Sequence, residues 1–414
     1  MNEAKQKFRL TSLERAWILY DVGNSAFVLL VATLIPIFFN ALAEGGGLSS
    51  VEYLAYWGYA ASAVTVITAV LSPILGTLAD TRNFKKPIFT FCVAVGVIGC
   101  CAMGMASTWL PFLLIFIFAK VGFSGSLVFY DSMLSDVTVP DRMDEVSSKG
   151  YAWGYIGSCV PFVVCLALVL GAGSIGISQM TALNLALFIT AAWWLVTTLP
   201  LLRQYQQVHF VEVQEHAIRQ SFARIGHTLR HLKEDRQVFW FLLAFFCYID
   251  GVYTIIDMAT AYGTALGLDT TGLLLALLVT QIVAFPSALV FGRLSGQYPS
   301  GTLIPVCIAA YAGIALFAFF LKHQWQFWVL AVVVGMFQGG IQALSRSHFA
   351  KIIPPEKSGE YFGLFDICGK GASFLGTMIV SVGSQLTGSA NVGVGSLIVL
   401  FIVGFVLFRV SDRK

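Results

Sequence analysis

Residues 110–134 read LPFLLIFIFAKVGFSGSLVFYDSML, an almost continuous apolar run that contains one lysine and one aspartate. A helix that crosses a bilayer needs about 20 consecutive, predominantly apolar residues. The run shows none of the apolar–polar alternation that marks the strands of a membrane barrel. It therefore predicts a transmembrane α-helix. Its two charged residues, Lys120 and Asp131, are candidates for function because charge inside a membrane is costly.

Eleven further stretches of this kind occur along the 414 residues. Hydrophobic residues make up 57% of the chain and charged residues 11%, whereas soluble domains carry about 25% charged residues. A soluble fold of this length could not keep so much apolar surface from water, so we expect lipid to be the solvent. The twelve predicted helices lie near 17–42, 53–79, 86–107, 110–134, 150–171, 180–202, 237–262, 271–293, 301–321, 325–347, 360–386 and 391–409.

The basic residues predict the orientation of these helices. If both termini are cytoplasmic, 22 of the 25 lysines and arginines fall on the cytoplasmic side, and only Lys322 falls outside. Positive residues concentrate on the cytoplasmic side of membrane proteins, so we expect both termini there. The short loops and the absence of an N-x-[ST] sequon fit a bacterial inner membrane. We therefore expect a multi-pass protein of the plasma membrane, with its first helix retained.

The longest connection divides the chain into two halves of six helices. It spans 203–236, and Ile218, Phe222, Ile225 and Leu229 recur within it at helical spacing, as expected of an amphipathic helix on the membrane surface. Tyr20-Asp21 in the first half resembles Tyr248-Ile249-Asp250 in the second, as expected of a parallel repeat. The predicted organisation is a six-helix bundle over 1–202, a cytoplasmic linker over 203–236 and a second six-helix bundle over 237–414.

The segment GTLADTRNFKK at 76–86 resembles the loop 2–3 signature of the major facilitator superfamily. The resemblance implies an all-α membrane protein with twelve transmembrane helices in two pseudo-symmetric six-helix bundles. It also implies a latch that closes the cytoplasmic side. Gly76 would allow close helix approach, and Asp80 would lie at a helix N-terminus across the interface. Arg82 is expected to pair with Asp136. Thr81 departs from the signature, which usually has a basic residue there. The predicted cytoplasmic gate comprises Gly76, Asp80, Arg82, Asp136 and Arg346.

Charged residues within the predicted helices mark a candidate cavity. Asp366 and Lys370 share a helix face, so they either contact a zwitterionic solute or neutralise each other. Lys120 lacks an oppositely charged neighbour on its helix and needs either a partner on another helix or an anionic group of the substrate. Asp21 and Asp250 are candidates for carrying a proton or binding sodium, the alternative being hydrogen bonds to neighbouring groups. The predicted substrate and ion cavity consists of Tyr20, Asp21, Asn24, Lys120, Tyr130, Asp131, Asp250, Tyr253, Gln342, Asp366 and Lys370.

Three ordered motifs carry a more specific resemblance. WILYDVGNSAF at 17–27, GGIQALSRS at 339–347 and EYFGLF at 360–365 are similar to the signatures of the autophagy-related vacuole effluxer family. The resemblance covers most of the chain and implies the major facilitator fold. It suggests efflux of amino acids, the role associated with the vacuolar relatives. The motif residues that it places in the cavity are Tyr20, Asp21, Asn24, Ser25, Gln342, Ser345, Arg346 and Lys370.

We therefore expect secondary active transport of a small polar solute, an amino acid or short peptide, by alternating access. No G-x-x-x-x-G-K-[ST] motif for nucleotide binding is present, so a proton or sodium gradient is the expected energy source. The alternative is an exporter or flippase of amphiphiles, lysolipids or drugs. A membrane enzyme built on Asp131, Asp136, Asp141 and Asp144 is disfavoured. We expect no metal or other cofactor, no nucleic-acid partner, and a monomer whose partners are the solute and the bilayer.

Overall fold

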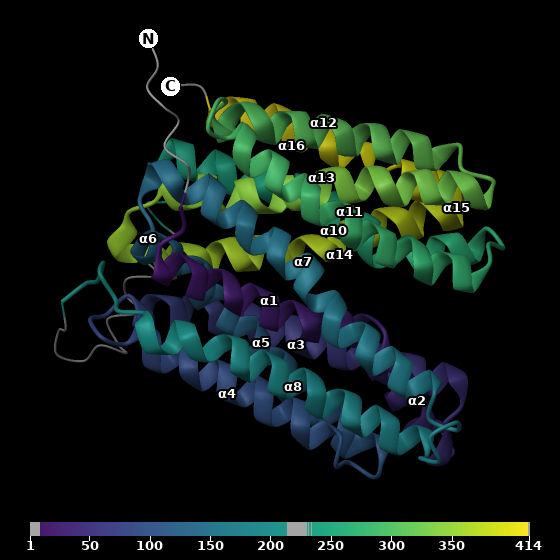
Figure 1. Ribbon diagram of the computed structural model, residues 1–414. Coiled ribbons are helices and arrows are strands. Elements are labelled where there is room, and N and C mark those ends of the chain that lie inside the picture. Colours follow the sequence, from purple (N-terminus) through teal and green to yellow (C-terminus); the bar gives the residue numbers. More distant parts are fainter. Residues whose placement is uncertain (1–8, 213–229, 231, 233, 413–414) are drawn as a thin grey trace.

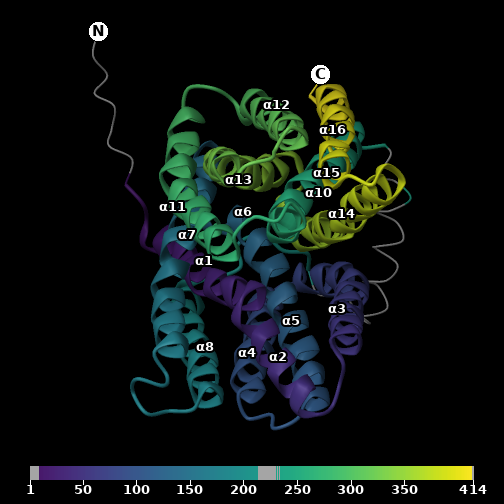
Figure 2. The ribbon, with the colours of Figure 1, turned by 90° about the vertical axis from the view of Figure 1, so that its right-hand side faces the viewer.

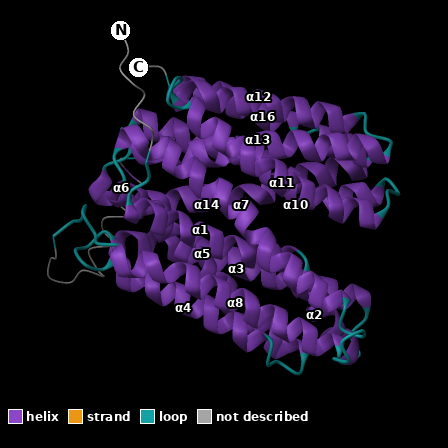
Figure 3. Ribbon diagram, in the orientation of Figure 1, coloured by secondary structure: helices purple, strands orange, loops and turns teal. Residues whose placement is uncertain are grey.

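The computed structural model describes residues 9–212, 230, 232 and 234–412, and these residues are almost entirely helical (Figure 3). Twelve helices in the described part of the chain are long and apolar enough to cross a membrane. The predicted helix count is therefore confirmed. The amphipathic helix expected around Ile218, Phe222, Ile225 and Leu229 lies outside the described residues.

The first half of the chain forms one bundle (Figure 1). Its first spanning helix is interrupted at Thr33, whose backbone departs from helical geometry (φ −131°, ψ −73°) and divides α1 from α2. This break was not predicted, because the apolar run continues through it. The elements are α1 (Ser12–Ala32), α2 (Leu34–Gly45), α3 (Ser50–Ala79), α4 (Lys85–Met103), α5 (Trp109–Ser132), α6 (Leu134–Val137), α7 (Pro140–Leu170) and α8 (Gln179–Gln204).

The second half forms the other bundle. Asp269 caps its second spanning helix by accepting a hydrogen bond from the backbone N–H of Gly272, at 2.7 Å. Gly388 ends its fifth in the left-handed conformation that glycine tolerates, at φ 67°. The elements are α10 (Arg236–Ala265), α11 (Thr270–Leu294), α12 (Ser300–Phe319), α13 (Gln324–Ile352), η1 (Pro355–Lys357), α14 (Ser358–Thr387), α15 (Ala390–Gly395) and α16 (Ile398–Ser411).

Helix α7 begins ten residues before the helix predicted near 150–171. The segment PDRMDEVSSK is too polar to resemble a membrane span, but Pro140 suits the first position of a helix. The helix therefore extends beyond its apolar part. Its added turns contact the second bundle, since Ser147 donates a hydrogen bond to the carbonyl of Ala343 at 2.8 Å.

The bundles meet in two places: α7 packs against α11 and α13, and α14 packs against α3 and α5 (Figure 2). Helix α1 begins and helix α16 ends at the same end of the molecule, called the terminal end below (Figure 1). The ribbons of the two bundles meet at the terminal end and separate toward the opposite end (Figure 1). Side chains near this contact therefore decide how the bundles hold together and come apart.

Candidate functional site

Arg346 of α13 contacts several side chains of the first bundle. Its Nη1 lies 3.0 Å from Oδ1 of Asp131 on α5 and 3.7 Å from Oδ2 of Asp21 on α1. Its Nε donates a hydrogen bond to the hydroxyl of Ser147 at 2.9 Å, and the guanidinium is 2% exposed. One buried cation from the second bundle therefore faces two carboxylates from the first.

Aromatic rings of the first bundle surround this guanidinium. Its central carbon lies 4.3 Å from the ring centre of Tyr151, 4.6 Å from that of Trp17 and 5.3 Å from that of Tyr130. Such cation–π contacts strengthen when water is excluded. The Tyr130 hydroxyl also donates to Asp21 at 3.1 Å. We call Arg346, Asp21, Asp131, Trp17, Tyr130 and Tyr151 the Arg346 cluster.

Two predicted cavity residues brace the first bundle internally. The Tyr20 hydroxyl donates to Ser126 of α5 at 2.6 Å, and the Asn24 amide donates to the backbone carbonyl of Tyr20 at 3.1 Å. The second bundle repeats the first contact, since Tyr248 of α10 shares a 2.7 Å hydrogen bond with Ser345 of α13. The two halves therefore share a tyrosine–serine link between corresponding helices, which agrees with a parallel repeat.

Asp366 and Lys370 form an ion pair, which is one of the two alternatives that their spacing left open. Lys370 Nζ lies 2.6 Å from Asp366 Oδ1, and both residues are on α14. Ser72 of α3 donates to Asp366 at 2.8 Å, so the pair also joins the two bundles. Gln342 of α13 makes a similar connection by accepting a hydrogen bond from Tyr155 of α7 at 3.2 Å.

Lys120 of α5 forms no ion pair among the residues that the structure describes. Its Nζ lies 4.7 Å from the ring centre of Phe123 and 5.9 Å from that of Phe27. Its charge interacts with those of Lys370 and Asp257, two residues of the second bundle. Asp257 of α10 is exposed and likewise has no ion-pair partner in the described part of the chain.

Asp257 was not among the predicted site residues, although its position in a membrane helix was a signal for including it. Tyr253, one turn before it, is partly exposed, and its ring lies close to Gly369 of α14. Lys120, Asp257, Tyr253 and the Asp366–Lys370 pair thus bring polar groups of both bundles to one region of their interface.

Asp250 is separate from this interface. It is 0% exposed and faces α14 within the second bundle. Its Oδ1 accepts hydrogen bonds from the backbone N–H of Gly376 at 2.9 Å and from Thr254 at 3.2 Å. Its Oδ2 is buried and has no hydrogen-bond partner among the described residues. The structure therefore does not bring Asp250 together with the other predicted cavity residues.

The terminal end is closed by a network that we call the terminal latch, formed by Gly76, Asp80, Lys85, Asp136, Ser358 and Gly359. Asp80, at the end of α3, accepts hydrogen bonds from the backbone N–H groups of Gly359 at 2.7 Å and Glu360 at 2.8 Å. These groups belong to the first turn of α14, where the helix dipole favours negative charge. This is the placement expected from the sequence signature.

The expected pairing of Arg82 with Asp136 is wrong. Arg82 lies in the exposed turn between α3 and α4 and contacts Glu212, 3.4 Å away. Lys85 takes the inner position because it begins α4 and is fully buried. Its Nζ lies 3.6 Å from Asp136 and 3.9 Å from Asp80, and it donates to Ser358 at 2.8 Å.

Residues 205–212, called the post-α8 segment, complete the latch in a way that the sequence did not indicate. Tyr205 donates to Asp136 at 2.5 Å, and the backbone N–H of His209 donates to it at 2.9 Å. Burial raises the pKa of Asp136, but Lys85 and the bonds from His209 and Tyr205 outweigh burial and hold the pKa below its usual value. The described start of the predicted linker is thus an extended segment packed on the first bundle.

The acids considered for a membrane enzyme bind separate partners. Asp131 pairs with Arg346, Asp136 with Lys85, and Asp144 with Lys351 at 2.6 Å. No group of three or more histidine, cysteine or acidic residues suited to a metal ion occurs within the described ranges. Three of these four acids are therefore explained as contacts that hold helices together.

Comparison with known proteins shows the family. A model described as "Vacuole effluxer Atg22 like" matches residues 12–138 and 135–414. A Bacillus subtilis protein described as the uncharacterized MFS-type transporter YxiO is 42% identical over 404 residues, which cover 96% of this chain and 94% of that protein. Autophagy-related protein 22 of Saccharomyces cerevisiae is 26% identical over 283 residues, 59% of this chain and 53% of the yeast protein.

Solved structures show the same fold. The transporter FucP in its outward conformation aligns with a TM-score of 0.74 at 16% identity, covering 97% of this chain and 98% of that one. The human organic anion transporter MFSD10 aligns with a TM-score of 0.72 at 13% identity, covering 96% and 98%. The expected major facilitator fold is confirmed. This chain belongs to the Atg22-like vacuole effluxer family and is a transporter of the major facilitator type.

Proposed function

We propose that this transporter moves small zwitterionic solutes, free amino acids or short peptides, by alternating access. The observation that carries the proposal is the placement of Lys120 and Asp257. They come from opposite bundles, and neither is neutralised by an ion pair among the described residues. A charge within a membrane-spanning helix is costly and is retained where a partner, water or a ligand compensates it. A carboxylate bound near Lys120 and an ammonium group bound near Asp257 would compensate both.

Alternating access is supported by where the bundles touch. The terminal latch and the Arg346 cluster both join the bundles, and the ribbons diverge away from the terminal end (Figure 1). Opening the terminal end requires these contacts to break while others form at the opposite end. Rocking of two pseudo-symmetric bundles about a central site is the motion that such repeats permit.

We further propose that the terminal end faces the cytoplasm of a plasma membrane. The distribution of basic residues supports this orientation. The conformation described would then be open toward the outside. Export is the direction suggested by the name of the matching family, and a proton gradient is the proposed energy source.

Counterflow in proteoliposomes tests the substrate class. Vesicles loaded with an unlabelled amino acid are expected to take up the labelled one through the wild-type protein. Amino-acid amides lack the carboxylate, and N-acetyl amino acids lack the ammonium group. We expect Lys120→Gln to weaken binding of the amino acid and of its N-acetyl form, with little effect on the amide. Asp257→Asn should show the opposite selectivity.

Arg82→Gln is the matched control, because Arg82 is exposed at the terminal end and remote from this region. If Lys120→Gln and Asp257→Asn affect the amino acid, its amide and its N-acetyl form equally, Lys120 does not bind the carboxylate and Asp257 does not bind the ammonium group. Absence of counterflow across amino acids and peptides, with competition by lysolipids in a lipid-transfer assay, would replace the proposal with transport of amphiphiles.

A further inference from the structure

Asp250 is a buried carboxyl group inside the second bundle that the proposed transport cycle has not yet used, and its Oδ2 has no hydrogen-bond partner among the described residues. Tyr248 and Ser345 correspond to Tyr20 and Ser126, which aligns α10 with α1. Asp21 follows its tyrosine by one residue, whereas Asp250 follows by two. One residue turns a helix by about 100°, so the two acids point in different directions. Asp21 faces Arg346, and Asp250 faces α14.

The surroundings of Asp250 offer an ionised carboxylate little compensation. Thr254 and the Gly376 N–H both bond to Oδ1, and Oδ2 has no donor among the described residues. No lysine, arginine or histidine in the described ranges forms an ion pair with it. The thiol of Cys247 is a titratable neighbour on the same helix, as are the hydroxyls of Tyr248 and Tyr253. The charged residues of the described helices packed against α10 are Arg293 on α11, Arg346 and Lys351 on α13, Glu360, Asp366 and Lys370 on α14, and Arg409 on α16.

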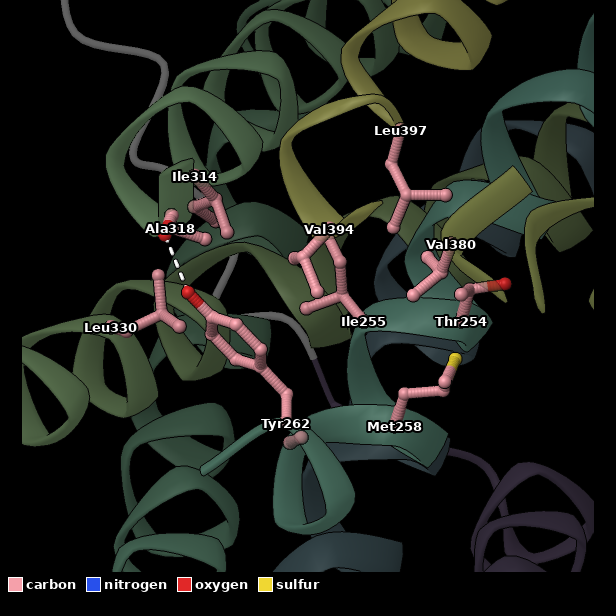
Figure 4. Close-up of a pocket in the computed structure, with 11 residues that line it drawn as sticks. Thr254, Ile255, Met258, Tyr262, Ile314, Ala318, Leu330, Val380, Val394 and Leu397 are labelled. Atoms are coloured by element: carbon pink, nitrogen blue, oxygen red, sulfur yellow. Dashed lines mark hydrogen bonds between the residues drawn. The ribbon is translucent and has the colours of Figure 1, made fainter. Parts of the chain in front are cut away.

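The side of α10 next to Asp250 is apolar. Thr254 lines a small pocket together with Ile255, Met258, Tyr262 and Val380, among others (Figure 4). The Thr254 hydroxyl points away from the other lining side chains in this view, and the Tyr262 hydroxyl donates to the carbonyl of Ala318 at 2.6 Å (Figure 4). The pocket thus supplies no free oxygen toward Asp250. A cation would find too few ligands here, whereas a proton needs only the carboxyl oxygen.

We propose that Asp250 is a proton-binding site: it is a neutral carboxylic acid in this conformation and couples transport to a proton gradient. Removal of the proton from the carboxyl group would leave a carboxylate in an apolar environment, a costly state. That cost would be relieved by a shift of α10 against α14 that admits water. The position of α14 is coupled to the terminal latch, because Asp80 binds its first turn.

The contact between α10 and α14 is tight enough to transmit such a shift. A Cβ built on Gly376 would lie 2.6 Å from Oδ1 of Asp250 and would overlap the Thr254 hydroxyl. Only glycine lets the backbone of α14 approach the carboxyl group this closely. A change in the charge of Asp250 therefore acts directly on the backbone of α14.

Infrared spectroscopy of the purified protein tests the protonation state without any substrate. The wild type should show a protonated-carboxyl band at neutral pH that Asp250→Asn lacks and Thr254→Val retains. An unchanged band in Asp250→Asn would mean that Asp250 is ionised, and the proposal would fail. Asp250→Ser provides a second neutral variant if Asp250→Asn does not fold.

Proteoliposome transport tests the coupling, and this part rests on the proposed function. Asp250→Asn should keep amino-acid counterflow but lose accumulation driven by a pH gradient, while Thr254→Val keeps both. Accumulation that persists in Asp250→Asn overturns the proposal, as does wild-type accumulation driven by sodium and not by pH. If the wild type shows no counterflow, the proposed substrate class is wrong, and the infrared result alone decides whether Asp250 binds a proton.

Discussion

Gly76 of α3 and Gly359 of α14 pack backbone against backbone at the terminal end. A Cβ built on Gly359 would lie 2.5 Å from the carbonyl oxygen of Gly76, and one built on Gly76 would overlap the carbonyl group of Gly359. The absence of both side chains lets Asp80 reach the N-terminus of α14. Closure of this end therefore depends on two glycines that are far apart in the sequence.

Gly76→Ala should favour opening of the terminal end. The added methyl group must push α14 away, which would break bonds between Asp80 and α14 that contribute about 1.5–3 kcal/mol each. Spin labels at Val139 and Glu356, exposed residues of the two bundles at this end, report the change as a longer distance. Gly58→Ala is the control, because a Cβ at Gly58 on the same helix meets no atom within 4 Å. Equal distance distributions in both variants would contradict the role of Gly76.

Lys85→Ala should destabilise the protein far more than Arg82→Ala. Lys85 is fully buried between Asp80 and Asp136, and removing one partner of a buried pair typically costs about 3–5 kcal/mol. Arg82 and Glu212 have side chains 52% and 70% exposed, and such pairs contribute about 0–1 kcal/mol. Thermal unfolding in detergent measures the difference. A melting temperature lowered equally by both substitutions would show that Lys85 is not the cation of the latch.

The contact between His209 and Asp136 should stabilise the latch more at low pH than at high pH. The hydrogen bond to Asp136 raises the pKa of His209, against a smaller effect of burial. A raised pKa means that the stabilisation is complete below about pH 6.5, the unperturbed value, and is lost as the pH rises through the raised value. Asp136 stays ionised through this window because its pKa is lowered.

The melting temperature of the wild type should therefore fall relative to that of His209→Gln as the pH rises through this window. His323→Gln is a suitable control, because His323 lies at the opposite end of the molecule, before α13. If the difference in melting temperature between the wild type and His209→Gln stays constant with pH, the imidazole charge does not contribute to the contact.

Arg346→Lys should loosen the contact between the bundles despite keeping the positive charge. An ammonium group cannot reproduce the planar stacking on Trp17 and Tyr151 or the simultaneous bonds to Asp131 and Ser147. The distance between the spin labels at Val139 and Glu356 should lengthen. A loss of 1.4 kcal/mol in the contact between the bundles would change the ratio of open to closed molecules about tenfold. Arg293→Lys, a conservative change at an exposed residue in the last turn of α11, should leave it unchanged.

The sequence alone determined that lipid surrounds most of the chain, how many helices cross the membrane, and that the chain divides into two halves. These three properties follow from the apolar content of short stretches of sequence. That content does not depend on which helices pack against each other in the folded protein. The ion pair between Asp366 and Lys370 was predictable for the same reason, since one helix turn fixes their distance. The family signatures added the closure of the terminal end through Asp80.

Only the tertiary structure decided which charged groups meet. Arg346 and Asp131 are 215 positions apart, and their contact depends on the rotation and approach of two helices in different bundles. The same dependence placed Lys85 rather than Arg82 beside Asp136, turned Asp250 toward α14 and brought the post-α8 segment into the latch. A small rotation of a helix changes the partner of each side chain, whereas the apolar content of that helix stays the same.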